Sequence, residues 1–401
     1  MRRVVLHVGT PKTGTSFVQD LLFQQREALA AQGVLYPADR FDAHFLAALD
    51  LMELRWGGLE HQAVGAWDRL AQQVRAWEGH TVIVSHEILA RASVEQVRLA
   101  LESFGADREV HVVLSARDLV RQIPAEWQEN VKHRRTVAYR DFLDQVTADV
   151  PETEVATWFW GVQEVPAILG RWGGTLPPEH VHVVTVPKPG SPRSLLWERF
   201  AGVFGLDPQA WASESERANP SLGAPETALV RAINQRVNGG VLANDHYRDL
   251  VRETLAHRAL AHRRGSPRLF LPPDVRTWAT DLSHRWIAEL EAREYDVVGS
   301  LEDLRPDTAD ATGFVDPDEQ GPADLVEPMM DAVVTLLQKG AELREEVERL
   351  HQELDSTRHE RDQAYLAAGL LHRAKHALVR RSETHRTAHL ALKAYRRARG
   401  R

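Results

Sequence analysis

The sequence contains no cysteine among its 401 residues, which excludes disulfide bonds and metal sites built on thiolates. It also lacks an apolar run of the roughly 18 residues that a transmembrane helix needs. No leader of the signal-peptide type precedes the first apolar segment. From these absences we expect a cytoplasmic protein.

Histidine is plentiful, at 19 residues, but the H-E-x-x-H spacing is missing, so the sequence predicts no metal. The net charge of −8 is unevenly spread. Residues 370–401 carry ten Lys and Arg against one acidic residue, about +9, which leaves about −17 for the rest. This distribution argues against a nucleic-acid-binding surface and indicates a local basic tail.

Apolar runs of strand length alternate with amphipathic stretches over the first 200 residues, a pattern typical of an α/β fold. The expected strands are residues 3–8, 81–85, 110–115 and 181–186. The expected helices are residues 15–31, 94–104, 118–134, 157–171 and 191–205, with mostly helical structure over 207–300. Because the strands are continuously apolar, we expect a mostly parallel central sheet with helices on both faces, a three-layer sandwich.

The chain changes character after an α/β domain of residues 1–300. Residues 302–331 hold ten acidic residues, one arginine and four prolines, so we interpret 301–331 as a solvated linker. Beyond it, apolar residues recur at alternating steps of three and four, namely Val333, Leu336, Leu343, Val347, Leu350 and Leu354. This seam predicts a coiled coil of about three heptads within residues 332–401.

The C-terminal segment has two open questions. Residues 333–357 would join copies of this chain or recruit a different protein, and the sequence does not decide between them. The basic tail would lie on an anionic membrane surface or a polyanion as an amphipathic helix, which would make the protein membrane-peripheral. A solvated helical end of the coiled coil explains the same composition.

The most specific motif is Gly-Thr-Pro-Lys-Thr-Gly-Thr-Ser at residues 9–16, directly after the first apolar run. An ordinary Walker A loop reads G-x-x-x-x-G-K-[S/T], with its lysine after the second glycine. Here the two glycines and Ser16 keep their positions, but Thr15 stands where the lysine belongs. The loop's one lysine is Lys12. We expect a loop that binds a phosphate without the usual contact to a triphosphate.

Each part of this loop has a physical role in anion binding. The glycines let the backbone approach an anion, and the helix that follows points free N–H groups at it. Hydroxyl groups add donors, and Lys12 would place a positive charge where charge grows as a bond breaks. The expected binding residues are Pro11, Lys12, Thr13, Gly14, Thr15 and Ser16. A turn that merely joins strand to helix is the alternative.

Two further polar groups follow expected strands. His86 and Glu87 come after the second strand, and Arg117 and Asp118 come after the third. Ligands of open α/β sheets gather at this carboxyl edge, where His86 or Glu87 would serve as a general base. We favour Glu87; a helix cap is the alternative. Arg117 would grip a phosphate in a bidentate way, or form a salt-bridged helix start.

The loop resembles the 5′-phosphosulfate loop of the PAPS-dependent sulfotransferases, P-K-[T/S/A]-G-T-[T/S]. Arg117 and Asp118 resemble the start of that family's R-[N/D]-P-x-x-x-x-x-S motif, which grips the 3′-phosphate of PAPS. Leu119 replaces the proline and Ala125 the serine, so the missing contact would come from Gln122 or Arg121. The resemblance covers about residues 3–300 and points to the bacterial, actinomycete-type branch.

The resemblance implies transfer of a sulfuryl group from PAPS to a hydroxyl of a carbohydrate, glycolipid or small metabolite, without a metal. Lys12 and Glu87 or His86 would be the catalytic residues, since members of the family use either a glutamate or a histidine as base. It also suggests tryptophans for acceptor stacking, Trp127, Trp158 and Trp160, and a polar turn over the nucleotide, residues 219–223.

Two rival functions remain. A P-loop kinase or NTPase would share the loop, but Thr15 stands in the lysine position and no clear Walker B run follows. A non-catalytic nucleotide-binding scaffold that acts through its coiled coil would explain the departures from the 3′-phosphate motif.

Overall fold

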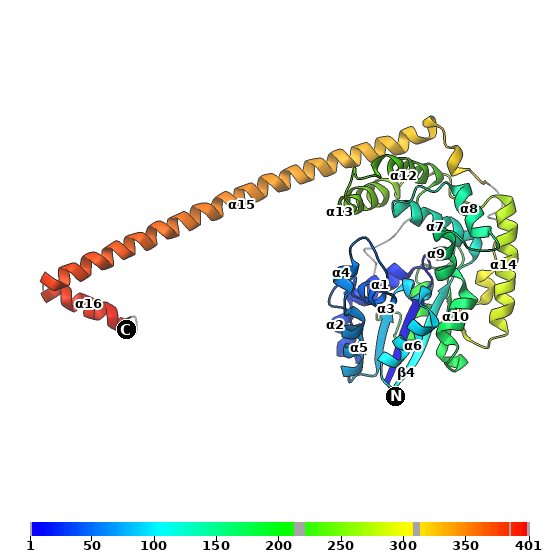
Figure 1. The fold of residues 1–401 in the computed structure, drawn as a ribbon, viewed down its shortest axis with the longest axis horizontal. Helices are drawn as coiled ribbons and strands as arrows, with labels where there is room; N and C mark the ends of the chain where they lie inside the picture. Colours follow the sequence, from blue (N-terminus) through cyan, green and yellow to red (C-terminus); the bar gives the residue numbers. More distant parts are fainter. Residues whose placement is uncertain (1, 212–220, 308–312, 385, 399–401) are drawn as a thin grey trace. The chain divides into compact units, whose positions relative to one another are not determined.

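The computed structural model describes residues 2–211, 221–307, 313–384 and 386–398. The chain divides into two units, one ending at Thr335 and one beginning at Leu336. The first unit holds a six-stranded sheet with helices on both faces (Figure 1), and the described part of the second is helical.

The sheet is parallel throughout. Its strands are β1 Arg2–Gly9, β2 Val34–Leu35, β3 Thr81–Ser85, β4 Arg108–Ala116, β5 Val181–Thr185 and β6 Asp296–Val298. Their order is β2-β3-β1-β4-β5-β6, and each neighbouring pair runs in the same direction. The expected parallel sheet is therefore confirmed, and the four long apolar runs are its four inner strands, β3, β1, β4 and β5.

The strand order places a binding edge at the end of β1. This strand pairs with β3 on one side and with β4 on the other, so the chain builds the sheet outward from β1 in both directions. Such a topological switch point is where ligands of open α/β sheets bind. The segments after β1, β3 and β4 therefore meet at one edge.

The helices and shorter helical turns of the first unit form the outer layers. They are α1 Thr15–Gln24, α2 Arg26–Ala31, α3 Ala43–Met52, α4 Glu60–Ala63, α5 Ala66–Ala76, η1 Glu87–Arg91, α6 Val94–Ser103, α7 Leu119–Lys132, α8 Tyr139–Thr147, α9 Glu154–Gln163, α10 Val165–Gly173, η2 Pro178–His180, α11 Leu195–Phe204, α12 Ala224–Val237, α13 Asn244–Tyr247, the π-helical η3 Arg248–Leu260, α14 Pro273–Glu291, η4 Leu301–Leu304 and η6 Pro317–Glu319.

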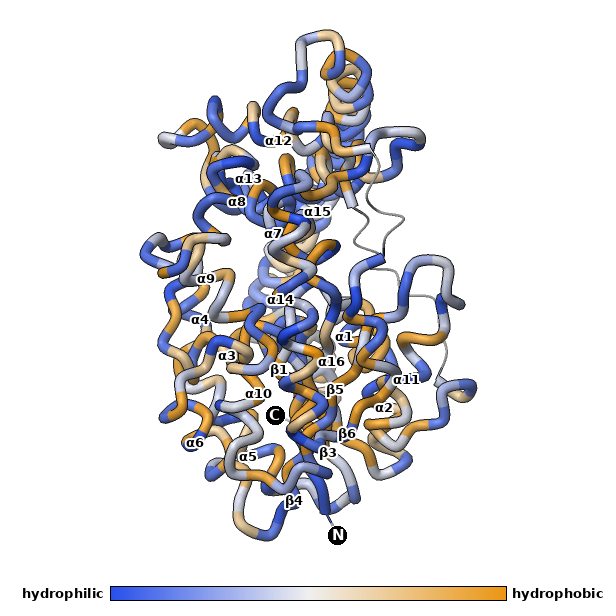
Figure 2. The backbone as a smooth tube through the Cα atoms, turned by 90° about the vertical axis from the view of Figure 1, so that its right-hand side faces the viewer, coloured by the Kyte–Doolittle hydropathy of each residue, from blue (hydrophilic) through white to orange (hydrophobic). Residues whose placement is uncertain are grey.

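Two hydrophobic cores lie on opposite faces of the sheet. Val5 and Val113 face the smaller core, which α1 and α11 cover, for example through Phe200. Leu6 and Leu114 face the larger core, which includes residues of α7, α9 and α10. In Figure 2 the hydrophobic stretches concentrate around the central strands. Alternate residues of each strand thus bury both faces, as the continuous apolar runs predict.

Some elements differ from the sequence expectation. The helix expected over residues 15–31 is divided at Gln25 into α1 and α2, and that expected over 157–171 is divided at Glu164 into α9 and α10. Pro166 explains the second division, because proline has no N–H to donate to the carbonyl four residues earlier and its ring clashes with that carbonyl, whereas it fits the first turn of a new helix.

The acidic segment expected to be a solvated linker is largely packed onto the first unit. Asp303 pairs with Arg199 at 2.7 Å, and Asp318 pairs with Arg231 at 3.0 Å. A further helix, α15, begins at Pro322 rather than after 331 and runs to Thr384. Asp303 and Asp318 are therefore partners for arginines of the α/β unit, a role that composition alone does not reveal.

The described part of the second unit consists of the rest of α15 and of α16, Arg386–Ala398. The apolar side chains of the expected seam are 37–50% exposed in this single chain. Their pairing with another helix stays a prediction. Among the described residues, no helix is both long enough and apolar enough to cross a membrane.

Candidate functional site

The loop after β1 is held in shape by close backbone packing. Gly9 and Gly14 have φ values of +141° and +89°. A Cβ on Gly14 would come within 2.5 Å of Leu196, and one on Gly9 within 3.0 Å of Ala90 and of the Glu87 carbonyl oxygen. Both positions therefore require glycine. Lys12 has a φ of +64°, also in the left-handed region, which is uncommon for a residue with a side chain.

Helix α1 directs its N-terminus at this loop. Gly14 is its N-cap, and among the described side chains none caps the helix by a hydrogen bond. The first N–H groups of a helix have no intrahelical partner and carry its positive dipole end. Thr15 and Ser16 stand in this first turn. The arrangement suits an anion, as the sequence predicts.

Thr13 supports the loop from within. Its hydroxyl donates to the Thr10 carbonyl oxygen at 2.5 Å and lies 2.6 Å from the Ser115 hydroxyl. Ser115 in turn donates to the carbonyl oxygen of Gly9 at 2.9 Å. The hydroxyl proton of Thr13 is thus used inside the loop, which corrects the expectation that it serves as a donor to the anion.

A buried histidine ties the three strand ends together. His7 Nδ1 lies 2.8 Å from the Ser85 hydroxyl of β3, and Nε2 lies 3.1 Å from the Ser115 hydroxyl of β4. Burial lowers the pKa of His7 to about 4, so the ring is neutral at pH 7. It fixes the edge of the sheet rather than supplying charge to it.

Lys12 is ion-paired with a carboxylate of α7. Its Nζ lies 2.8 Å from Glu129 Oε2, and each side chain is 18% exposed. Glu129 also pairs with His133 at 3.1 Å and with Arg252 at 3.4 Å. Burial opposes ionisation of Glu129, but Lys12 and His133 outweigh it and hold the pKa of Glu129 well below its usual range. The lysine therefore already has an anionic partner that an incoming anion would replace.

Arg117 lies beside the same loop. Its Nη1 donates to the Lys12 carbonyl oxygen at 3.4 Å. The neighbouring Asp118 caps α7 through the Arg121 N–H at 2.9 Å and pairs with the Arg121 guanidinium. Arg121 also donates to the Pro187 carbonyl oxygen at 3.3 Å. The salt-bridged helix start is thus made by Asp118 and Arg121, whereas Arg117 reaches the loop.

Gln122 corrects one expectation. It is buried, and its Nε2 donates to the Pro11 carbonyl oxygen at 2.5 Å and to Gln163 Oε1 at 2.9 Å. Gln163 donates in turn to Glu126 Oε1 at 2.8 Å. The amide of Gln122 therefore holds the loop in place and does not offer its N–H groups to a 3′-phosphate.

His86 and Glu87 differ in what they offer as a base. His86 Nδ1 accepts from the Ile88 N–H at 3.3 Å, so the neutral ring carries its proton on Nε2. Glu87 Oε2 accepts from Gln19 Nε2 at 2.8 Å. Burial acts most strongly on Glu87 and would raise its pKa, but His86 and the Gln19 hydrogen bond outweigh it and lower that pKa. Glu87 is therefore the group with a free lone pair at neutral pH.

One of the three expected stacking tryptophans belongs to the core. Trp127 is fully buried and donates to the Val137 carbonyl oxygen at 3.1 Å, which corrects the expectation of stacking for this residue. Trp160 is partly buried against the core and donates to the Val146 carbonyl oxygen at 3.0 Å. Of the polar turn expected at 219–223, residues 219 and 220 lie outside the described residues.

Trp158 has a different position. Its ring lies 5.4 Å from that of Trp56, which lies 5.7 Å from Phe45 and 6.1 Å from His133. Phe45 lies 5.1 Å from His86. These rings form an aromatic row, Phe45, Trp56 and Trp158, that extends from the candidate base to the residues that hold Lys12.

Sequence reasoning missed the acidic side chains of α7. Gln122, Glu126 and Glu129 follow one another at steps of four and three, so they share one face of the helix, and that face meets the loop. Burial raises the pKa of Glu126 to about 7, with Glu129 adding to the effect against the opposing charge of Lys12. A polar stripe on a helix that begins at the candidate site was the signal.

The comparisons with known proteins give a single finding. No protein-family profile matches the chain, and no curated protein matches it either. Among solved structures it is similar to a sulfotransferase from Alicyclobacillus acidocaldarius at 17% identity, with 78% of this chain and 99% of that chain covered and a TM-score of 0.39. At this identity and TM-score the likeness does not establish a shared activity.

Proposed function

We propose that this protein is a PAPS-dependent sulfotransferase. The observation that carries the proposal is the position of its loop lysine. Lys12 lies inside the phosphate loop, at the carboxyl end of the central strand, with Arg117 of the neighbouring strand end donating to its carbonyl oxygen. A triphosphate-binding loop places its lysine after the second glycine, whereas here Thr15 stands at that position.

The loop and Arg117 would bind different parts of PAPS. The N–H groups of α1 with Thr15 and Ser16 would bind the 5′-phosphosulfate, and Arg117 would bind the 3′-phosphate. Lys12 would leave Glu129 and contact the oxygen that joins phosphorus to sulfur. The charge that develops there as the S–O bond breaks would be stabilised by its ammonium group.

Glu87 would be the base. The acceptor hydroxyl oxygen would attack sulfur in line with the leaving oxygen, its proton would pass to Glu87, and adenosine 3′,5′-bisphosphate would leave. Its lowered pKa keeps Glu87 ionised at neutral pH. His86 is the weaker candidate because its Nδ1 lone pair is used by the Ile88 N–H.

The acceptor class follows from the aromatic row. The rings of the aromatic row are partly buried, and aromatic faces that stay accessible can stack on a sugar or aromatic ring. Trp158 also lies against the Arg91 guanidinium at 4.9 Å. A hydroxyl of a carbohydrate, a glycolipid or a small metabolite therefore suits the site. We expect Trp158→Ala to raise KM for the acceptor more than it lowers kcat.

Calorimetric titration of adenosine 3′,5′-bisphosphate tests the donor assignment, with AMP and ATP-Mg as controls. We expect binding that requires the 3′-phosphate and weakens at least tenfold in Arg117→Ala. Arg98→Ala is the matched control, because that arginine forms exposed ion pairs on α6 with Glu95 and Glu102.

Other outcomes would replace the proposal. If ATP-Mg bound instead, the protein would be a P-loop kinase or NTPase. If adenosine 3′,5′-bisphosphate bound but no acceptor received sulfate, the nucleotide-binding scaffold that acts through α15 would stand in its place. Transfer of labelled sulfate to an acceptor panel, abolished in Glu87→Gln and retained in His86→Asn, then tests the base.

A further inference from the structure

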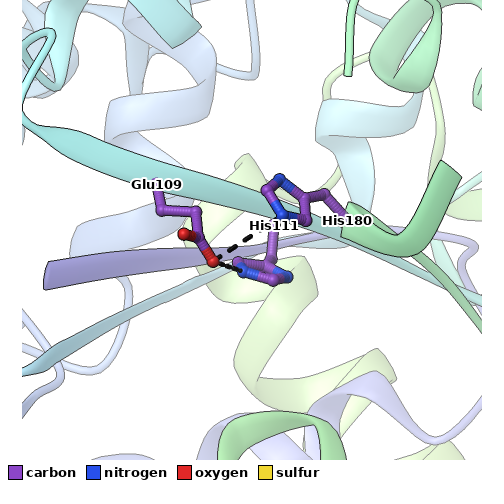
Figure 3. A group of neighbouring side chains, drawn as sticks. All are labelled: Glu109, His111 and His180. Carbon is purple, nitrogen blue, oxygen red and sulfur yellow. Dashed lines mark hydrogen bonds and ion pairs between the residues drawn. The ribbon is translucent and has the colours of Figure 1, made fainter. Parts of the chain in front are cut away.

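Three metal-ligating side chains converge in the first half of β4, away from the phosphate loop (Figure 3). Glu109 and His111 belong to β4, and His180 ends η2, just before β5. Glu109 Oε1 lies 2.7 Å from His111 Nε2 and 3.7 Å from His180 Nε2. One ligand atom from each lies within 4.8 Å of the others. The three side chains are 26%, 12% and 22% exposed.

The group continues across the sheet as a chain of short contacts. His111 Nδ1 lies 2.9 Å from His182 Nε2 on β5, and His182 Nδ1 lies 2.6 Å from Asp296 Oδ2 on β6. The two imidazoles are thus held between two carboxylates, those of Glu109 and Asp296. We call these four residues the histidine relay.

The histidine relay is one proton short when both rings are neutral. It contains three contacts of hydrogen-bond length, Glu109 to His111, His111 to His182, and His182 to Asp296. Each contact needs one proton, and ionised carboxylates supply none. Two neutral imidazoles carry only two protons between them. A proton on one ring completes the set, and so does a metal cation that replaces the contact at one end.

We propose that Glu109, His111 and His180 bind a divalent transition metal ion of the zinc class. Two imidazole nitrogens and one carboxylate oxygen are ligands that Zn²⁺ prefers, and a water molecule would fill the fourth position of a tetrahedral site. A tetrahedral Zn²⁺ site holds its ligand atoms about 3.3 Å apart, so the 2.7 Å contact between Glu109 and His111 would widen. The rings of His111 and His180, whose centroids lie 4.3 Å apart at an interplanar angle of 34°, would turn toward the ion.

Metal binding would satisfy the whole histidine relay. With His111 Nε2 on the metal, its proton lies on Nδ1 and is donated to His182 Nε2. His182 then donates its Nδ1–H to Asp296. A ligating histidine that donates its other N–H to a supporting group is the usual outer arrangement of a metal site, so His182 and Asp296 are positioning residues here.

The site would join β4, the turn before β5 and, through Asp296, the edge strand β6. Its role would therefore be structural, because the metal would hold these strands of the sheet together. The sequence prediction of no metal rests on spacings along the chain, and this cluster combines residues 109 and 111 with residue 180. Only the parallel pairing of β4 with β5 brings them together.

Titration of Zn²⁺ into tag-free full-length protein tests the proposal. The chain offers a competing site, because His372 and His376 lie one helical turn apart on exposed α15, with ring centroids 4.5 Å apart. All variants are therefore made in a His372→Ala background. We expect one Zn²⁺ per chain, lost or weakened at least 100-fold by His111→Ala or His180→Ala, and unchanged by His61→Ala, an exposed histidine elsewhere.

A second set of variants separates ligation from folding. Asp296→Asn leaves all three ligands in place and should weaken Zn²⁺ binding about 10- to 100-fold. Co²⁺ in place of Zn²⁺ should give the strong visible absorption of a four-coordinate ion, and it should vanish in His180→Ala. Zn²⁺ binding that survives His111→Ala and His180→Ala in folded protein, or that disappears with His372→Ala alone, would overturn the proposal.

Discussion

At the scale of single residues, the ion pair between Lys12 and Glu129 is the feature that most affects the proposed chemistry. The ammonium group of Lys12 cannot pair fully with Glu129 and with the nucleotide that donates the sulfuryl group at the same time. Glu129→Gln removes the competing charge, so we expect it to tighten adenosine 3′,5′-bisphosphate binding about tenfold, or ~1.4 kcal/mol. Calorimetry measures the change, and Glu95→Gln, on the exposed face of α6, should leave the affinity unaltered. Weaker binding in Glu129→Gln would instead make Glu129 a support that the loop needs.

Glu126 gives the site a pH dependence. Its pKa is raised from 4.5 to about 7 by burial, so the folded state holds a proton that the unfolded state has lost between these two pH values. Stability is therefore fully present below about pH 4.5 and falls as the pH rises to about 7. We expect Glu126→Gln to remove this fall and to be about 2–3 kcal/mol more stable than the parent at pH 8.

Denaturant unfolding at pH 5 and pH 8 measures this difference. Because many groups titrate, the comparison is between the parent and the variant at each pH. A Gln→Glu change at an exposed position, such as Gln72→Glu on α5, should show no such pH-dependent difference. If the free energy of unfolding changed equally between pH 5 and pH 8 in the parent and in Glu126→Gln, the assignment of the raised pKa to Glu126 would be wrong.

At the scale of elements, the turn from β1 into α1 depends on a glycine for two separate reasons. Gly14 has a φ of +89°, and a Cβ there would come within 2.5 Å of Leu196 Cδ2, so that side chain would have to move, whereas Gly190 has a φ of +90° and nothing within 4 Å. Gly190→Ala should therefore cost only the backbone strain, about 1–2 kcal/mol. Gly14→Ala should cost more and should abolish bisphosphate binding. Equal effects of the two variants on binding would show that the contact with Leu196 is unimportant.

The exposed seam of α15 makes a second prediction at this scale. Because apolar residues at alternating steps of three and four form a coiled-coil seam, we expect the protein to have a mass above the 45.2 kDa of one chain in light scattering. Leu343→Asp with Leu350→Asp should reduce it to one chain. Gln352→Asp, which lies off the seam, should not. If the parent protein is a monomer, the seam does not join copies of this chain. Binding of the basic tail to anionic vesicles would then be measured.

The longer elements of the sheet were predictable because their signals are local. β3 follows with its bounds, and β4 and β5 follow to within one or two residues, from runs rich in Val, which pack well in a sheet covered on both faces. β2 and β6 have two and three residues, too few for any periodicity. They form because β3 and β5 present open edges to them, which is a property of the folded sheet rather than of either segment.

At the scale of the whole molecule, the sequence predicted some properties of the candidate site and not others. The segments carrying Lys12, Glu87 and Arg117 could be placed at one edge, because each follows a strand of a parallel sheet. The hydrogen-bond partner of each polar group could not be predicted. Gln122 and Thr13 were expected to face a ligand, and their hydrogen bonds instead hold the loop. Such choices depend on helix orientation, and α7 turns its polar stripe to the loop only once its apolar face packs on the core.

The position of β6 has a consequence for the order in which the chain folds. This strand pairs His182 with Asp296, more than 100 residues apart, so β5 is synthesised long before its outer neighbour. Until then its open edge is available to strands of other chains, and such long-range pairing is slow to form. The outer end of the histidine relay is completed by the same event, so a chain interrupted before Asp296 would have both an uncovered sheet edge and an unsupported His182.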